Sequence, residues 1–201
     1  MVTEALLVAP NTPEPFQTLA SVRISQVRLE DAKTALSKSM ELWKDLPPEG
    51  PGVPDFSTRI SLSRLLMEAQ MEEDALEVLE RLVGEDDSSV EAWYLGGWCL
   101  YLMGDKREEG VGRMATTDGD TSNDQIALMV SSREWLQNSL KLYEVLDYED
   151  DRLRDHALEL VQGLDAELGE VVGDDDEDGS GDEDWEDEVE NEYGDQEMNG
   201  T

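Results

Sequence analysis

The chain has 201 residues and a formal net charge of −35, and it is long enough for one domain with a hydrophobic core. Residues 170–201 hold 16 Asp and Glu and no Lys or Arg, so residues 1–169 carry the remaining −19. A body this acidic repels nucleic acid and anionic membranes and favours basic partners. We therefore expect no direct contact with nucleic acid or membrane.

Residue types that catalysis and metal binding require are scarce. Cys99 is the only cysteine and His156 the only histidine, which excludes an internal disulfide, a thiolate metal cluster and a histidine-rich metal site. We expect Cys99 to be inert among apolar neighbours, and His156 to lie on the exposed side of its helix. No nucleophile–base pair or phosphate-binding glycine loop is visible, so we expect neither an enzyme nor a cofactor.

The short apolar segment "ALLVA" near the start of the chain does not indicate a signal peptide. It follows Glu4 and lacks the basic residues that precede the apolar core of such peptides. No apolar run in the sequence is long enough to span a membrane. An intracellular, reducing compartment fits the sequence best.

The first two predicted repeats cover residues 13–46 and 56–89. Small or apolar residues occupy positions 8, 20 and 24 of both, counted from Pro13 and from Phe56. They are Ala20, Ala32 and Leu36 in the first repeat, and Ser63, Ala75 and Leu79 in the second. The segment between the repeats, "PPEGPGVPD", is rich in Pro and Gly and predicts a loop.

A third repeat is predicted over residues 90–148. Gly97 lies at its position 8 and Gly104 at position 15, where a turn would separate two helices. The polar, glycine-rich residues 106–125 predict an inserted loop. Beyond it, Leu136 and Leu140 resume the spacing of a second helix.

The end of the chain divides into a helix and a tail. Residues 151–168 carry apolar side chains on one helical face and follow Asp150, a residue type suited to a helix N-terminus. We expect this segment to be the helix that caps the end of the solenoid. Residues 170–201 are too acidic and too poor in apolar residues to form a core, so we expect a disordered tail.

The 34-residue spacing, the small residue at position 8 and the Gly-Asp pair after it resemble the tetratricopeptide (TPR) repeat. The predicted fold is therefore all-α, a TPR-like solenoid of helical hairpins over residues 13–169. Pro10 and the Asn-Thr-Pro-Glu that follows resemble the junction between two such repeats. Residues 1–12 are accordingly predicted to be the end of a truncated preceding repeat, and the chain to begin inside a solenoid.

An aromatic row marks the candidate binding surface. Tyr94, Trp98 and Tyr101 share one face of a helix, next to a row of Trp93, Gly97 and Leu100. We assign the row that contains Gly97 to helix packing, where this glycine lets the paired helix approach closely. The aromatic row matches the positions that line the concave groove of TPR proteins, although aromatic rows also pack against neighbouring elements. Gly96 has no firm explanation.

Residues of the second and third repeats complete the candidate client-binding groove. The full set is Tyr94, Trp98, Tyr101, Glu91, Ile60, Arg64, Met67 and Glu68. Equivalent groove positions are also occupied by Ser57 in the second repeat and by Gln17, Ser21 and Ile24 in the first repeat. A clamp of the kind that binds the C-terminal carboxylate of Hsp90 is rejected, since Gln17 and Ser21 replace its basic and amide residues.

Two acidic segments resemble calcium-binding loops but fail at essential positions. Asp174, Asp176 and Asp178 fit positions 1, 3 and 5 of such a loop, yet Trp185 stands where a bidentate Glu is required. The segment "DGDTSND" from Asp118 fails in the same way, so no metal site is expected.

The segment "EAWYLGGWCLYLMG", the insertion after it and the tail sequence "EDWEDE" together resemble the fungal dedicated TPR-repeat assembly chaperones of large-subunit ribosomal protein four. The resemblance implies a chaperone that binds the long internal loop of this newly made, basic ribosomal protein and escorts it to pre-60S assembly. It implies a cytoplasmic and nuclear location, with nuclear import machinery reached through the client.

Two alternative functions remain open at this point. One is a general, histone-type chaperone of basic proteins that acts mainly through its acidic tail, although such a tail can also serve only to keep a protein soluble. The other is a TPR scaffold for an unrelated peptide.

Overall fold

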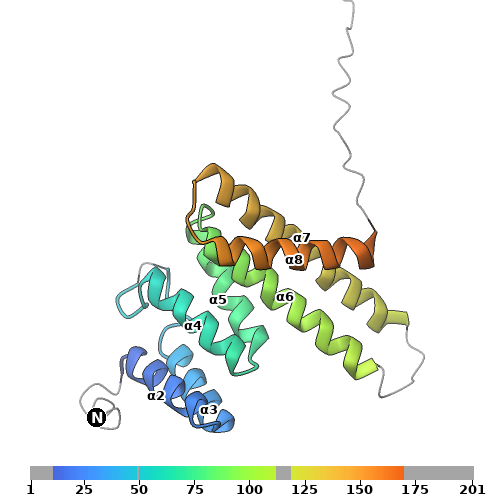
Figure 1. Ribbon diagram of the computed structural model, residues 1–201. Coiled ribbons are helices and arrows are strands. Elements are labelled where there is room, and N and C mark those ends of the chain that lie inside the picture. The colour runs from blue at the N-terminus through green and yellow to red at the C-terminus, as the bar shows by residue number, and fades with distance from the viewer. Residues whose placement is uncertain (1–10, 49, 112–118, 170–201) are drawn as a thin grey trace, which may run out of the picture. The chain divides into compact units, whose positions relative to one another are not determined.

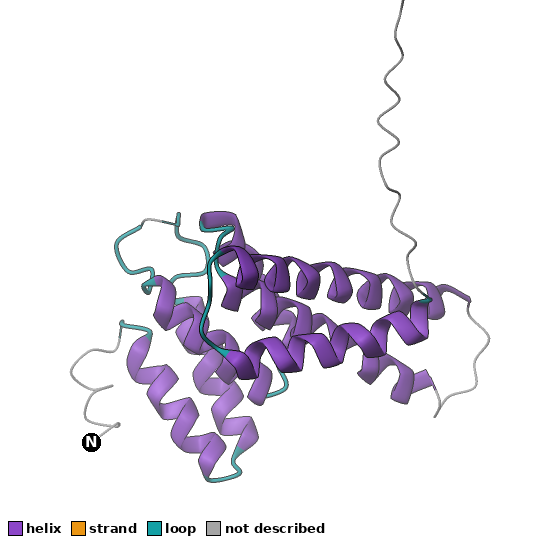
Figure 2. Ribbon diagram, turned by 45° about the horizontal axis from the view of Figure 1, so that its top comes forward, coloured by secondary structure: helices purple, strands orange, loops and turns teal. Residues whose placement is uncertain are grey.

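The computed structural model describes residues 11–48, 50–111 and 119–169, with side chains at 11–48, 50–106 and 123–169, and all regular structure in these ranges is helical (Figure 2). The helices are α2 (Glu14–Ser25), α3 (Leu29–Glu41), α4 (Phe56–Glu68), α5 (Glu72–Glu85), α6 (Val90–Val111), α7 (Gly119–Val145) and α8 (Asp151–Leu168). The expected acidic tail and the truncated repeat, apart from residues 11 and 12, lie outside the described residues. None of the helices in these ranges is long and apolar enough to cross a membrane.

The helices form a TPR-like solenoid of stacked hairpins. α2 packs on α3, α4 on α5 and α6 on α7 (Figure 1). The first hairpin contacts α4 through α2 and α3, and the second contacts α6 through α5 and α4. The small residues of the repeat pattern lie where helices meet, and Ala20, Ala32, Ser63 and Ala75 are fully buried. Because a small side chain lets two helix backbones come close, the 34-residue pattern specifies the spacing of the hairpins.

The turn between the helices has a left-handed residue at position 15 of the first two repeats. Val27 has a φ of 58° and Gln70 a φ of 59°. At the equivalent position of the third repeat, Gly104 lies inside α6, and the helix continues to Val111. A Cβ atom at Gly104 would lie 3.0 Å from Cε of Met129 on α7. This glycine therefore permits close packing of α6 and α7 and does not form the expected turn.

The loop predicted over residues 106–125 is largely wrong. α6 extends to Val111 and α7 begins at Gly119, so residues 106–111 and 119–125 of the predicted loop are helical, and residues 112–118 lie outside the described residues. The polar composition was misleading, because the Lys-Arg-Glu-Glu run at 106–109 consists of residues with high helix propensity. A polar helical segment needs no apolar face when only part of it packs against a partner.

Two adjacent glycines bring α6 and α7 together. A Cβ atom at Gly96 would lie 2.2 Å from the ring of Trp135, and one at Gly97 would lie 2.6 Å from Cγ of Leu136. Ser132 Oγ also donates a hydrogen bond of 2.8 Å to the carbonyl oxygen of Gly97. The packing function expected for Gly97 is confirmed, and Gly96 makes room for an indole ring that the sequence pattern did not indicate.

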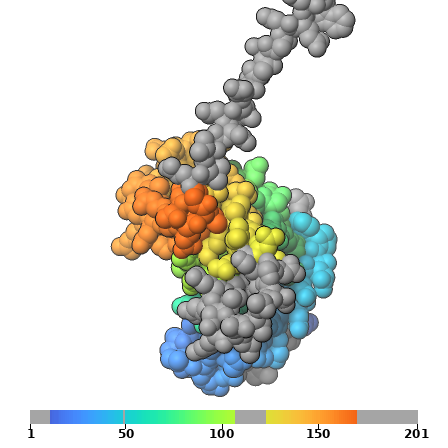
Figure 3. Space-filling view, turned by 90° about the vertical axis from the view of Figure 1, so that its right-hand side faces the viewer, coloured from blue at the N-terminus to red at the C-terminus, as the bar shows by residue number. Residues whose placement is uncertain are grey.

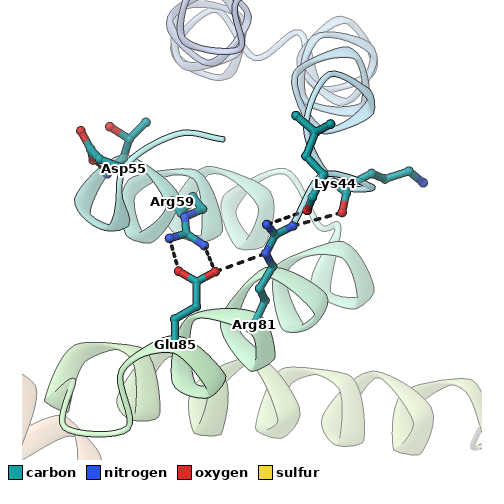
Figure 4. A network of polar contacts seen from close by, with 7 residues as sticks. Lys44, Asp55, Arg59, Arg81 and Glu85 are labelled. Atoms are coloured by element: carbon teal, nitrogen blue, oxygen red, sulfur yellow. Dashed lines mark hydrogen bonds and ion pairs between the residues drawn. The ribbon is translucent and has the colours of Figure 1, made fainter. Parts of the chain in front are cut away.

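A polar network joins the first hairpin to the second (Figure 4). Arg59 donates two hydrogen bonds to Glu85, of 2.7 and 2.5 Å, which hold the pKa of that carboxyl below its ordinary value. Arg81 bonds to the same carboxylate and to the carbonyl oxygens of Lys44 and Leu46. Because those carbonyls follow α3, the network attaches the end of the first hairpin to α4 and α5.

α8 covers the last hairpin. Asp150 accepts hydrogen bonds from the backbone N–H groups of Arg152 and Leu153 and so caps its N-terminus, as its residue type indicated. Leu153, Ala157 and Leu164 are buried, and α8 packs on both α6 and α7. In Figure 3 the orange-red surface of α8 borders the yellow first half of α7.

Candidate functional site

The aromatic row of α6 is partly covered by α8. Tyr94 is only 8 % exposed, and its hydroxyl is 2.8 Å from Nδ1 of His156. The ring of Trp98 meets His156 edge to face, with 5.0 Å between the ring centroids. His156 is therefore half-buried against the aromatic row, and its expected exposure is wrong. The sequence did contain a signal for this burial, because His156 is next to Ala157 on the border of the apolar face of α8.

Burial also fixes the protonation state of Tyr94. Desolvation raises the pKa of its phenol to about 12, because the charged phenolate would lose hydration, and the nearby Arg64 offsets only part of that loss. Tyr94 consequently remains a neutral hydrogen-bonding group at physiological pH. The Tyr94–His156 contact ties α6 to α8.

A pocket of about 560 Å³ opens beside this aromatic row, between α4, α6 and the start of α8. Five of the predicted groove residues line it, and they come from α4 and α6. The complete lining is Arg64, Met67, Glu68, Tyr94, Leu95, Trp98, Leu102, Asp150, Arg152 and Leu153. The last three come from a segment far away in the sequence, so spacing within one repeat could not indicate them.

The remaining predicted groove residues lie around or beneath the pocket. Glu91 forms an ion pair with Arg64, which joins α6 to α4 at one end of the pocket. Ile60 is only 4 % exposed and belongs to the core. Tyr101 is half-buried against the core and does not line the pocket. Among the predicted residues, direct access to the pocket is thus limited to Arg64, Met67, Glu68, Tyr94 and Trp98.

None of the predicted groove residues of the first repeat lines the pocket. Gln17 is buried, and its amide bonds to Oγ of Ser39 at 3.4 Å. Ser39 also donates to the carbonyl oxygen of Pro13, so Gln17 belongs to the contact between α2 and α3. Ser21 is exposed and Ile24 is half-buried. Ser57 donates its hydroxyl proton to Asp55 at the N-terminus of α4.

The segment between α7 and α8 adds charge and apolar surface next to the pocket. Leu146 and Tyr148 are exposed large apolar residues, and Asp147 and Glu149 are exposed carboxylates between and beside them. Burial and the nearby carboxylates of Glu91 and Asp150 raise the pKa of Tyr148. Tyr148 therefore lies near the Arg64–Glu91 pair at the rim of the pocket.

The described residues offer little for metal or thiol chemistry. No group of three or more His, Cys, Asp or Glu residues is placed to hold a metal ion among the side chains at 11–48, 50–106 and 123–169. Cys99 is fully buried, and its thiol donates to the carbonyl oxygen of Glu72 at 3.2 Å. Burial raises the pKa of this thiol to about 12, which makes it unreactive. The calcium-loop segment from Asp174 lies outside the described residues.

Comparison with known proteins identifies relatives over most of this chain, although no model of a known protein family matches it. The "Probable assembly chaperone of rpl4" of Emericella nidulans is 58 % identical over 190 residues, which are 92 % of this chain and 50 % of that protein. The protein of the same name from Schizosaccharomyces pombe is 32 % identical over 162 residues, 80 % of this chain and 46 % of that protein.

A solved structure gives the same relationship. The structure titled "Assembly Chaperone of RpL4 (Acl4) (Residues 1-338)" is 59 % identical and superposes with a TM-score of 0.54, over 54 % of this chain and 38 % of that one. The chain spans about half the length of the curated relatives that it matches. On this identity and this shared helical fold, the chain is a relative of the fungal assembly chaperones of rpl4.

Proposed function

We propose that this chain acts in a dedicated chaperone that binds newly made ribosomal protein rpl4 on its concave surface and delivers it to assembly of the large ribosomal subunit. The observation that carries this proposal is the apolar pocket between α4, α6 and α8, with Trp98 in its lining and both acidic and basic residues around it. The names of the relatives supply the identity of the client.

The physical argument concerns a client that is basic and exposes apolar side chains before assembly. Such a segment binds RNA through its charge and aggregates through its apolar groups. The concave surface offers Trp98 and Met67 for apolar contacts and Glu68 and Asp150 for ionic ones. A binding surface of this kind masks both features of the client at once, without any catalytic chemistry.

The location follows from the same proposal. A client made in the cytoplasm and assembled in the nucleus needs protection in both compartments. Nuclear import machinery then acts on the client, and the chaperone travels with it.

Replacing Trp98 tests the proposal. Trp98→Ala should weaken binding of purified rpl4 by about tenfold or more, because a buried interfacial Trp commonly supplies a large share of the binding energy. Isothermal titration calorimetry gives the affinity, and circular dichroism establishes that the variant keeps its helices.

Trp93→Ala is the matched control, since Trp93 lies on the same helix but packs on Trp135 and does not line the pocket. Its affinity for rpl4 should match that of the unmodified chain. Equal affinities for all three proteins would contradict the proposed function.

A further inference from the structure

The pocket and the segment after α7 form one continuous surface. A second, shallow hollow of about 590 Å³ is lined by residues 146–150, and Asp150 lines both hollows. The two differ in character. The first has a floor of Met67, Leu95, Leu102 and Leu153, whereas the second combines Leu146 and Tyr148 with three carboxylates.

The charges of the first pocket nearly cancel. Glu68 and Asp150 oppose Arg64 and Arg152 around its lining, and Arg64 is also paired with Glu91. A rim of balanced charges over an apolar floor favours a large apolar side chain in the pocket itself, because a charged group on that floor would lose hydration without gaining a partner.

The second hollow has an unbalanced negative charge. Asp147 and Glu149 are exposed, and among the described side chains neither forms an ion pair. Asp150 accepts backbone hydrogen bonds at the start of α8 and contributes a third carboxylate. A cationic side chain would gain these partners while its aliphatic stem packs on Leu146 or Tyr148.

We propose that the two hollows together bind a short extended segment of a basic protein, with a large apolar side chain in the pocket of Leu102 and Trp98 and a neighbouring Lys or Arg on residues 146–150. This inference rests on the proposed function and specifies what part of a client the site recognises. Charge alone does not satisfy such a site, and an apolar segment without basic neighbours satisfies it only in part.

The test uses the complete chain and the fluorescein-labelled peptide Lys-Lys-Gly-Phe-Leu-Gly-Lys-Lys, with binding measured by fluorescence anisotropy. Replacing Phe-Leu by Ala-Ala in the peptide, or all its Lys by Glu, should each lower the affinity by about tenfold or more, because each removes one half of the match. Equal binding of the Phe-Leu and Ala-Ala peptides would overturn the inference in favour of charge attraction alone.

Two pairs of protein variants locate the binding. Leu102→Lys places a charge in the apolar floor of the pocket and should lower the affinity for the peptide by about tenfold. Its control, Leu158→Lys, changes an exposed leucine of α8 outside the pocket and should leave the affinity unchanged. Glu149→Lys should lower the affinity for the peptide and reduce the salt dependence of binding. Its control, Glu80→Lys on the exposed face of α5, makes the same charge change and should alter neither quantity.

The outcomes separate this inference from the proposed function. If Leu102→Lys binds the peptide and rpl4 normally while Trp98→Ala loses rpl4, the inference is wrong and the proposed function stands. If the chain does not bind rpl4 but discriminates between the peptides as expected, the proposed function is wrong and the specificity of the surface stands. Analytical ultracentrifugation showing a dimer that Leu102→Lys converts to monomer would assign the pocket to a second copy of the chain and overturn the inference.

Discussion

Val27 occupies a backbone conformation that is unfavourable for its side chain. Its φ is 58°, and a β-branched residue there places its Cβ methyl groups against the backbone. The repeat pattern puts this residue at the turn between two helices, where TPR sequences favour glycine. The side chain is 92 % exposed, so no packing compensates for the strain.

Val27→Gly should therefore stabilise the chain by about 1 kcal/mol, because relief of the strain exceeds the extra entropy of an unfolded glycine. Chemical denaturation followed by circular dichroism measures the change. The control is Val22→Gly inside α2, at a side chain that is 36 % exposed, where glycine should destabilise by about 1 kcal/mol. The same sign at both positions would contradict a left-handed conformation at Val27.

The aromatic side chains of α6 also belong to the residue scale. Spacing alone placed Tyr94 and Trp98 on one face, and both line the pocket. Spacing could not show that His156 meets them, because that contact depends on how α8 docks 62 residues later in the chain. The packing alternative describes Tyr94, which is nearly buried, whereas Trp98 is only half-buried, and the assignment of this row to client binding stays a prediction.

At the scale of elements, the contact between α6 and α7 determines how the last hairpin is built. α7 passes so close to α6 that side chains from α7 lie over Gly96 and Gly97. A glycine within a helix costs roughly 1 kcal/mol against alanine. The close packing of Trp135 and Leu136 offsets this cost, so the two glycines serve the hairpin and not the isolated helix.

Gly97→Ala tests this contact. The new methyl group would lie 2.6 Å from Cγ and 3.0 Å from the backbone nitrogen of Leu136, so the variant should lose about 1–3 kcal/mol despite its better helix propensity. Gly84→Ala in α5 is the matched control, because no atom lies within 4 Å of its added Cβ, and it should gain up to about 1 kcal/mol. Thermal unfolding that shows a gain for both variants would exclude the close approach at Gly97.

At the scale of the whole molecule, charge is the dominant property. The chain carries −35 in total, of which residues 170–201 contribute 16 negative charges. Long-range attraction to a basic client increases the association rate, whereas contacts in the pocket lengthen the lifetime of the complex. The tail and the concave surface can thus make different contributions to binding.

Removing residues 170–201 separates these contributions. If the concave surface holds rpl4, the shortened chain should keep binding it, with an association rate lowered by about tenfold at low salt and little changed at high salt. Surface plasmon resonance at two salt concentrations measures both rate constants. Complete loss of binding would instead favour the histone-type chaperone that acts through its tail.

The sequence by itself determined the repeat spacing, the small residues at the helix contacts, the position of α8 and the acidic character of the chain. These properties are local or additive: a helical period of 3.6 residues fixes which side chains share a face, and charges sum without reference to the fold. The family resemblance rested on such local features, and the relatives confirm it.

Only the tertiary structure decided which side chains form the pocket. Leu153 and Asp150 reach it from a segment more than fifty residues beyond Trp98, and Gly96 is explained only by the indole ring that α7 places over it. It also decided that the polar segment after Gly104 continues α6, since helix propensity and packing against α7 exceeded the turn tendency of one glycine. Contacts between distant segments depend on how whole elements dock, and no period in the sequence encodes that arrangement.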